Sequence, residues 1–259
     1  MKAIFFITSL SIALGFSSCN KEDSLPAGKA RLQVYLTDDP GDYDEVNVDV
    51  QDVQINLTGE EDGGWQSLDG VAKGIYNLLD LVDNKDTLLV NAEIPAGKIQ
   101  QIRLVLGDQN TIVVDGIESN LETPSAQQSG LKLNIHQDVD AGLVYKMVLD
   151  FDASRSIVHT GSNKYILKPV IRTSLASIGG SIRGVVSPAD SLTNVLAIQG
   201  TDTIAGTYTG ATGGYWIGGL ETGSYSLHFL PSASFADTVR NDINVTNGSV
   251  TVVDTMYLK

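Results

Sequence analysis

Basic residues, cysteines and long apolar runs are all scarce in this sequence. The 259 residues include 17 Lys and Arg against 31 Asp and Glu, a formal net charge of −14. Binding to nucleic acid needs clustered cations that neutralise phosphates, so this balance argues against a nucleic-acid partner. The single cysteine cannot form a disulfide within the chain, and it excludes metal sites that need several thiolates.

Aromatic and charged residues are also few, at 7% and 19% of the chain. Hydrophobic residues make up 42%, which is enough for a buried core and therefore for a folded chain. The 26 glycines and the many β-branched residues suit tight turns and pleated surfaces. This composition predicts an all-β protein.

The longest apolar run lies at the N-terminus and follows Lys2. It has about 14 residues, fewer than the roughly 20 that cross a bilayer as a helix, so it is typical of an export signal. The run ends in Phe16-Ser17-Ser18-Cys19, which resembles the lipobox of bacterial lipoproteins, with Phe and Ser where Leu and Gly or Ala are usual. The resemblance implies a signal peptide over residues 1–18 and acylation of Cys19. More than one acyl chain would anchor the protein stably to a membrane.

Residues 19–28 are then expected to form a lipidated tether. The segment Asn20-Lys21-Glu22-Asp23-Ser24 resembles the acidic export tether of Bacteroidetes lipoproteins, although an ordinary polar linker explains its composition nearly as well. The resemblance implies an outer-membrane lipoprotein and favours the cell surface over the periplasmic face.

Beyond residue 28 the sequence alternates apolar and polar residues between turn residues, as half-buried strands do. The alternation changes phase near Gln51-Asp52, which predicts a bulge. Helical spacing is confined to residues 77–82, and residues 118–130 read as a polar loop. We expect strands in this first unit at residues 30–36, 46–57, 87–91, 99–106, 111–114, 131–135, 143–151 and 165–173.

Charge density falls near Ala176, and Ser177-Ile178-Gly179-Gly180 opens a second unit. Short strands with turns every 8–12 residues are the spacing of immunoglobulin-like sandwiches. We therefore expect two antiparallel β-sandwich domains of immunoglobulin- or transthyretin-like type, over residues 29–175 and 177–259. The strands of the second are expected at residues 181–186, 194–199, 207–208, 215–217, 223–229, 237–245 and 250–257.

The first domain carries an ordered set of motifs that looks like domain-of-unknown-function family 4382, common in lipoproteins of Bacteroidetes. The resemblance covers residues 29–174 and implies a β-sandwich without implying an activity. The motifs include Val34-Tyr35-Leu36-Thr37-Asp38-Asp39-Pro40, Ile94-Pro95-Ala96-Gly97, Leu149-Asp150-Phe151-Asp152 and Leu167-Lys168-Pro169-Val170.

The second domain resembles the carboxypeptidase-regulatory-like and collagen-adhesin B-type modules, in the transthyretin- or starch-binding-like group. The matching motifs are Ile182-Arg183-Gly184-Val185-Val186, Gly214-Tyr215-Trp216-Ile217 and Gly223-Ser224-Tyr225-Ser226-Leu227. Carbohydrate binding is attached to this group by fold analogy alone.

No recognised catalytic or cofactor motif occurs in the sequence: it contains no G-x-S-x-G, H-E-x-x-H, P-loop or Rossmann fingerprint. We therefore expect neither an enzyme nor a cofactor. An acidic Pro-Gly loop offers oxygen ligands for a hard cation such as Ca²⁺, but a solvated acidic face explains it more simply. The weak metal candidates in that loop are Asp38, Asp39, Asp42, Asp44 and Glu45.

Trp216 is the most informative aromatic residue. Period-two alternation buries Tyr215 and Ile217 and places Trp216 on the outer face, where it could stack on a sugar or anchor a protein. Packing against the first domain explains it equally well. Tyr208 is a second binding candidate, whereas Trp65 is expected in the core.

The triplet Asp-(Ser/Thr)-apolar occurs six times, more often than chance predicts. It resembles the O-glycosylation acceptor of exported Bacteroidetes proteins, although Asp followed by Ser or Thr is also natural turn chemistry. The candidate acceptors are Ser24, Thr87, Ser191, Thr203, Thr238 and Thr255.

These patterns favour a lipid-anchored, non-catalytic envelope protein that recognises a polysaccharide or a neighbouring surface protein. Carbohydrate is favoured by fold analogy. One alternative is a structural spacer or an adhesion or assembly subunit with no small ligand. A more remote alternative is a glycoside-active enzyme, which would need two carboxylates about 5–10 Å apart in a cleft.

Overall fold

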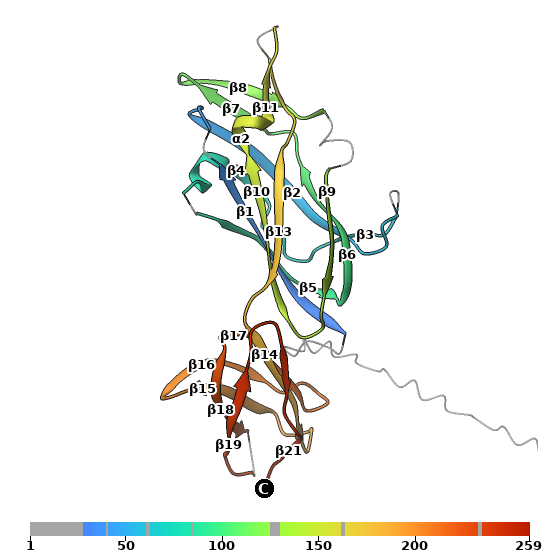
Figure 1. The fold of residues 1–259 in the computed structure, drawn as a ribbon, viewed down its shortest axis with the longest axis vertical. Coiled ribbons are helices and arrows are strands. Elements are labelled where there is room, and N and C mark those ends of the chain that lie inside the picture. Colours follow the sequence, from blue (N-terminus) through green and yellow to red (C-terminus); the bar gives the residue numbers. More distant parts are fainter. Residues whose placement is uncertain are drawn as a thin grey trace, which may run out of the picture.

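The computed structural model describes residues 28–39, 41–60, 63–83, 85–124, 130–161, 164–232 and 235–259. These residues are almost entirely β-strand and form two stacked sandwiches, which confirms the predicted all-β fold class (Figure 1). The expected signal peptide, Cys19 and Ser24 lie outside the described residues. Within the described ranges no helix is long and apolar enough to cross a membrane.

The first sandwich consists of two sheets. One has the strand order β13-β10-β1-β5, and the other has the order β11-β12-β8-β7-β2-β6-β9, with β3 and β4 paired to β2. The elements are β1 (Lys29–Asp39), β2 (Glu45–Asn56), β3 (Trp65–Ser67), β4 (Gly74–Asn77), η1 (Leu78–Leu81), β5 (Thr87–Pro95), β6 (Gly97–Leu106), β7 (Thr111–Val114), β8 (Ile117–Glu122), β9 (Leu131–Val139), β10 (Val144–Asp152), α2 (Ala153–Ser156), β11 (Ile157–His159), β12 (Tyr165–Leu167) and β13 (Ile171–Ser177).

Strand β1 shows why this sequence forms a sandwich. Its residues alternate between buried and half-buried along the whole strand, so Leu32, Val34 and Leu36 enter the core while their neighbours face outward. The core lies between the two sheets and draws on residues from Ala30 to Leu167. Most pairings are antiparallel, but β1 pairs in parallel with β10. Alternation carries no information about strand direction, so the sequence could not reveal this pairing.

Two local features confirm predictions made from the sequence. The register between β2 and β6 shifts between Val50 and Asp52, where the phase change predicted a bulge. The one segment with helical spacing is the 3₁₀ helix η1, capped by Asn77, whose side chain accepts from the Leu79 amide.

Two expectations for the first unit were wrong. Residues 117–122, taken as the start of a polar loop, form β8, because pairing with β7 satisfies their backbone even though few of their side chains are buried. The expected strand at residues 165–173 is two strands, since no strand continues through residues 168–170. Pro169 lacks an amide donor, and β12 and β13 join different sheets on either side of it.

The second sandwich has sheets β17-β14-β20, with β21 also on β14, and β16-β15-β18-β19. Its core is separate and draws on residues from Ile182 to Leu258. Each predicted strand is present, and the last is divided in two. The elements are β14 (Gly180–Ser187), β15 (Thr193–Gln199), β16 (Asp202–Tyr208), β17 (Gly214–Leu220), β18 (Gly223–Pro231), β19 (Thr238–Val245), β20 (Val250–Val252) and β21 (Met256–Tyr257).

Candidate functional site

Trp216 lies where the two sandwiches meet. Its neighbours Tyr215 and Ile217 are buried in the second core, so Trp216 takes the opposite face of β17, as alternation predicted. The indole N–H donates to the carbonyl of Gly142, with the two atoms 2.7 Å apart. Gly142 belongs to the turn between β9 and β10, in the first sandwich. Trp216 is therefore a contact between the domains.

Gly142 gathers several contacts at this junction. Its carbonyl also accepts from the Ser181 hydroxyl at 2.6 Å, and its amide donates to the Lys29 carbonyl at 2.7 Å. Its φ of +81° is a conformation that L side chains rarely adopt. A Cβ atom there would lie 3.3 Å from a methyl group of Val250. The turn thus needs glycine both for its backbone and for close approach.

The Trp216 ring, which is half-buried, makes further contacts. It lies against Gly218, where any Cβ atom would collide with the indole. The guanidinium carbon of Arg31, from the first sandwich, is 5.8 Å from the ring centroid, at the outer limit of a cation–π contact. Val250 of β20 packs against the first core. The junction is therefore built from both domains.

An open groove adjoins this junction, and we call it the junction groove. It encloses about 420 Å³ and is lined by Arg31, Asn194, Thr207, Tyr208 and Trp216 together with neighbouring backbone. Tyr208 is 51% exposed. The structure thus brings the two predicted binding residues to one groove, but Trp216 already has its N–H engaged.

The five acidic metal candidates do not come together as one cluster. The Asp44 carboxylate accepts from the Gly116 amide at 2.8 Å, and the Glu45 carboxylate accepts from the Asn47 side chain at 3.0 Å. Asp39 pairs with Arg172. Among the residues that the structure describes, no group of three or more His, Cys, Asp or Glu side chains is placed to hold a metal ion.

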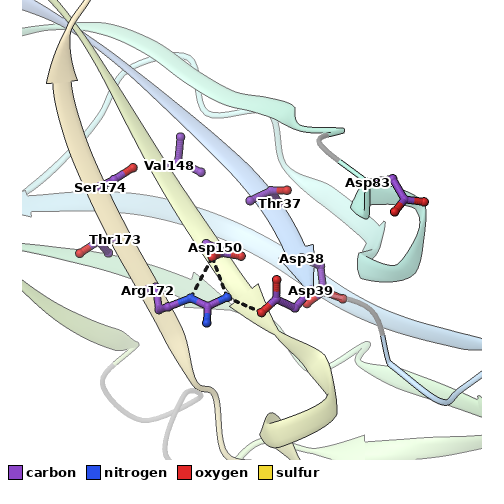
Figure 2. A pocket seen from close by; sticks show the side chains of 9 residues that line it. All are labelled: Thr37, Asp38, Asp39, Asp83, Val148, Asp150, Arg172, Thr173 and Ser174. Atoms are coloured by element: carbon purple, nitrogen blue, oxygen red, sulfur yellow. Dashed lines mark hydrogen bonds and ion pairs between the residues drawn. The ribbon is translucent and has the colours of Figure 1, made fainter.

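A second hollow, the outer-face cavity, lies on the outer side of the β13-β10-β1-β5 sheet (Figure 2). It encloses about 460 Å³, and its lining includes Thr37, Asp39, Asp83, Asp150 and Arg172. The Arg172 guanidinium donates to Asp150 at 2.9 Å and also to Asp39. One cation therefore bridges two carboxylates and offsets one of their two charges, whereas the two carboxylates of a glycoside-active site must be free to reach the substrate.

Asp38 differs from its neighbours because it points toward the core side of β1. It is 5% exposed, and one carboxyl oxygen accepts from the Ala153 amide at 2.9 Å. The other oxygen has no hydrogen-bond partner among the described residues. Burial raises the pKa of Asp38 to about 7, with Asp152 and Asp39 adding like-charge repulsion.

Trp65 is not a core residue, contrary to expectation. It is half-buried and belongs to neither hydrophobic cluster. The Arg103 guanidinium lies 3.8 Å from its ring centroid, and the Lys132 ammonium lies 6.0 Å from it. Two cations can cover an indole as apolar side chains do, so a tryptophan after a hairpin need not turn inward.

The Asp-(Ser/Thr)-apolar triplets differ in accessibility. Thr203 and Thr255 are exposed, and Thr87 and Thr238 are half-buried. Ser191 is 7% exposed, so its hydroxyl is not a surface acceptor in the folded chain. The third residue of four triplets is an exposed apolar side chain that no core accounts for: Leu88 at 40%, Leu192 at 52%, Ile204 at 48% and Val239 at 48%.

Sequence reasoning missed the residues that organise both hollows. Arg31 and Arg172 each sit at an outward position of a strand, and nothing in their local sequence distinguishes them from other surface cations. Gly142 follows Asp140-Ala141 in an ordinary turn. Only the pairing of distant strands shows what these residues contact.

Two stacked β-sandwiches and a polar groove at their junction define a nearly all-β sandwich protein. Residues 29–169 match the sequence model of the domain of unknown function DUF4382, which is more than half of the chain. The chain therefore belongs to this family. No curated protein matches the chain.

Solved structures resemble the chain only distantly. The Bacillus anthracis TIE protein has a TM-score of 0.23 at 10% identity, with 89% of this chain and 34% of that chain covered. A leucine-rich repeat protein from Bacteroides thetaiotaomicron gives 0.21 at 8% identity, with 90% and 26% covered. The shaft pilin SpaA of Lactobacillus rhamnosus GG gives 0.22 at 8%, with 89% and 98% covered. The chain thus spans about a third and a quarter of the first two proteins, and likenesses at these scores say nothing about function.

Proposed function

We propose that this protein is a lipid-anchored, non-catalytic adhesion or assembly module of the cell envelope whose two sandwiches act as one stiff unit. The observation that carries the proposal is the junction. Only residues 178 and 179 separate β13 from β14, and the Ile178 amide still donates to the Val144 carbonyl at 2.8 Å. Trp216 and Ser181 then bind the same carbonyl of the first domain.

Stiffness favours a role in holding or spacing partners. Domains joined by a flexible linker move independently, whereas contacts on several strands fix their relative orientation. Here β14, β17 and β20 all contribute residues to the junction. A protein that transmits position or load between a membrane and a partner benefits from such a joint.

Anchoring through Cys19 is part of this proposal. It rests on the export signal and the lipobox-like motif, which precede the described residues. The family itself has no assigned activity. Adhesion or assembly therefore follows from the rigid construction and the expected membrane location together.

The experiment that tests the proposal uses a deletion strain of the native host. Complementation with the wild-type chain is compared with a variant that carries six Gly and Ser residues inserted after Ser177. The insertion changes no residue of either domain, and its flexible linker is intended to uncouple them. We expect wild type alone to restore adhesion to a host-relevant surface or assembly of the envelope complex. A deletion strain that adheres and assembles like its parent would refute the proposal.

Carbohydrate binding is a second candidate, favoured by the junction groove. Tyr208 offers an exposed aromatic face, and Arg31 and Asn194 offer hydrogen-bond donors beside it. A glycan array probed with the chain from residue 20 onward, and with its Tyr208→Ala variant, tests this candidate. Binding that depends on Tyr208 would support carbohydrate binding. Absence of binding would refute it and leave the adhesion or assembly role unaffected.

A further inference from the structure

Strand β16 leaves one edge of its sheet open. Among the described residues it pairs with β15 alone. The Thr209 amide donates to the Thr193 carbonyl at 3.0 Å. Hydrogen-bonded pairs recur at every second residue of an antiparallel ladder, so Thr207 also bonds inward. The amides and carbonyls of Gly206 and Tyr208 therefore point away from the sheet, where the Tyr208 carbonyl accepts only a long contact of 3.4 Å from the Thr207 hydroxyl.

This edge carries almost no protection against pairing. Exposed edge strands are usually guarded by lysine, proline or inward-pointing charge. The sequence of β16 is Asp-Thr-Ile-Ala-Gly-Thr-Tyr, and its only charge is Asp202 at the first position. By contrast β19, the opposite edge of the same sheet, carries Arg240 and Asp242, and β13 carries Arg172.

The backbone of β16 is accessible to another strand. Neighbouring residues of a strand face opposite sides, yet Ala205, Gly206, Thr207 and Tyr208 all line the junction groove. The groove therefore follows the strand edge itself. The neighbouring edge β17 is also uncharged, but it is more buried and its Trp216 is held in the junction.

Two large side chains on this edge are apolar or aromatic and exposed. Ile204 is 48% exposed and Tyr208 is 51% exposed. On the adjacent strand β15, Leu196 and Ile198 are half-buried and belong to neither core cluster. Exposed apolar surface next to a free strand edge is typical of a protein contact.

We propose that β16 pairs edge to edge with β16 of a second copy of this chain, across a two-fold axis. A two-fold axis turns one strand antiparallel to its copy, so each copy's free amides meet the other's free carbonyls. The net charge of −14 disfavours contact between copies over most of the surface. The β16 edge carries a single carboxylate, at its first residue, so two copies repel each other less there than elsewhere.

The proposed contact buries little surface area, and we therefore expect a weak dimer. Seven residues of strand extend about 24 Å, and pairing them buries less than the roughly 1,200 Å² of a standard interface. We therefore expect a dissociation constant between about 1 μM and 1 mM. Two copies anchored in one membrane would meet at a higher effective concentration than in solution.

The test is sedimentation equilibrium of the unmodified chain from residue 20 onward, at concentrations up to about 1 mM. The Ile204→Lys variant places a lysine on the β16 edge, where its charge should prevent strand pairing. Val239→Lys on β19 is the matched control, because both side chains are 48% exposed. We expect wild type and Val239→Lys to dimerise and Ile204→Lys to weaken the dimer at least tenfold.

Amide hydrogen exchange locates the contact independently. Exchange at Gly206 and Tyr208 should slow as concentration rises, while the amides of β19 stay unchanged. A monomer at every concentration would overturn the proposal, as would equal loss of association in both lysine variants or protection confined to another strand. None of these outcomes bears on adhesion in the deletion strain, so the two proposals fail separately.

Discussion

Asp38 is a buried acid in a chain whose other acidic residues mostly face water. The pKa of about 7 means that the folded protein holds a proton which the unfolded chain releases near its ordinary value of 3.8. Between these two pH values the folded state binds more protons than the unfolded state. Stability therefore falls as the pH rises through this window. At neutral pH the buried Asp38 carboxyl group therefore destabilises the folded protein.

Replacing Asp38 with Asn should remove this cost. In wild type, Asp38 alone should lower the free energy of unfolding by about 2 kcal/mol or more between pH 4.5 and pH 7.5, because a unit of pKa shift is worth about 1.4 kcal/mol and screening by water reduces the total. The Asp38→Asn variant should lose most of this dependence. Urea unfolding at pH 4.5 and pH 7.5 measures it, with Asp39→Asn as the exposed neighbour for comparison. Equal pH dependence in wild type and Asp38→Asn would contradict the assignment.

Hydroxyl accessibility decides which triplets can be modified. A glycosyltransferase must reach the acceptor oxygen, so Thr203 and Thr255 are better acceptors than Ser191, which is 7% exposed. Peptide mapping of protein from the native host should find hexose-sized mass increments on the two threonines and none on Ser191. An intact mass equal to that of the acylated sequence would show that the triplets are turn chemistry alone.

At the scale of elements, much of the fold was predictable because alternation reflects burial directly. The longer strands of both domains, the bulge after Val50 and the 3₁₀ helix after Asn77 follow from local patterns. The short strands β3, β4 and β11 and the four-residue helix α2 were not predicted. Strand β8 was missed because few of its side chains are buried, so the pattern carries no signal. The parallel pairing of β1 with β10 was missed because direction depends on the whole topology.

The candidate site was predictable only in part, for a related reason. Alternation placed Trp216 on the outer face of its strand, but it could not say whether solvent or another domain covers that face. The answer depends on Gly142, a residue 74 positions away in the sequence. The alternation of residues shows which face of a single strand is buried. It does not show which distant strands meet at a junction between domains.

Truncation of Trp216 should destabilise the protein far more than truncation of Tyr208. The indole donates to Gly142 and covers Gly218, so Trp216→Ala should lower the free energy of unfolding by about 2–4 kcal/mol. Tyr208 is 51% exposed, and Tyr208→Ala should change it by about 0.5 kcal/mol or less. Urea unfolding compares the two. Similar losses in both variants would mean that Trp216 does not fasten the junction.

Two glycines of β17 offer a subtler comparison. A methyl group at Gly218 would collide with the Trp216 ring, whereas one at Gly214 would only reach an ordinary contact of 3.6 Å with the Thr212 hydroxyl. Gly218→Ala should therefore displace the indole and change its fluorescence, and Gly214→Ala should not. A Trp65→Phe background isolates the Trp216 signal, since the chain has 2 tryptophans. Unchanged emission in Gly218→Ala would show that the ring does not lie where the structure places it.

At the scale of the whole molecule, the first described strand begins in the middle. Strand β1 begins beside the junction, while β7, β8 and β11 occupy one end of the molecule and the C-terminus the other (Figure 1). The Gly28 carbonyl accepts from the Ala96 amide at 2.8 Å, which fixes where the tether starts. If Cys19 is acylated, the ten residue steps from it to the start of β1 span at most about 36 Å. The membrane must then lie nearer to the junction than to the far end of the first domain.

Fluorescence energy transfer to a labelled lipid tests this geometry in vesicles. Acylation blocks the thiol of Cys19, so a cysteine introduced at Lys98 or at Ile117 takes the dye alone. Lys98 is close to the β5–β6 turn at the junction, whereas Ile117 is 69% exposed on the far turn. Strand β1 spans about 36 Å between these levels. We expect strong transfer from position 98, weak transfer from position 117 and none from either in Cys19→Ala protein. Stronger transfer from position 117 would show that the far end of the first domain lies closer to the membrane than the junction does. That result would contradict the predicted geometry.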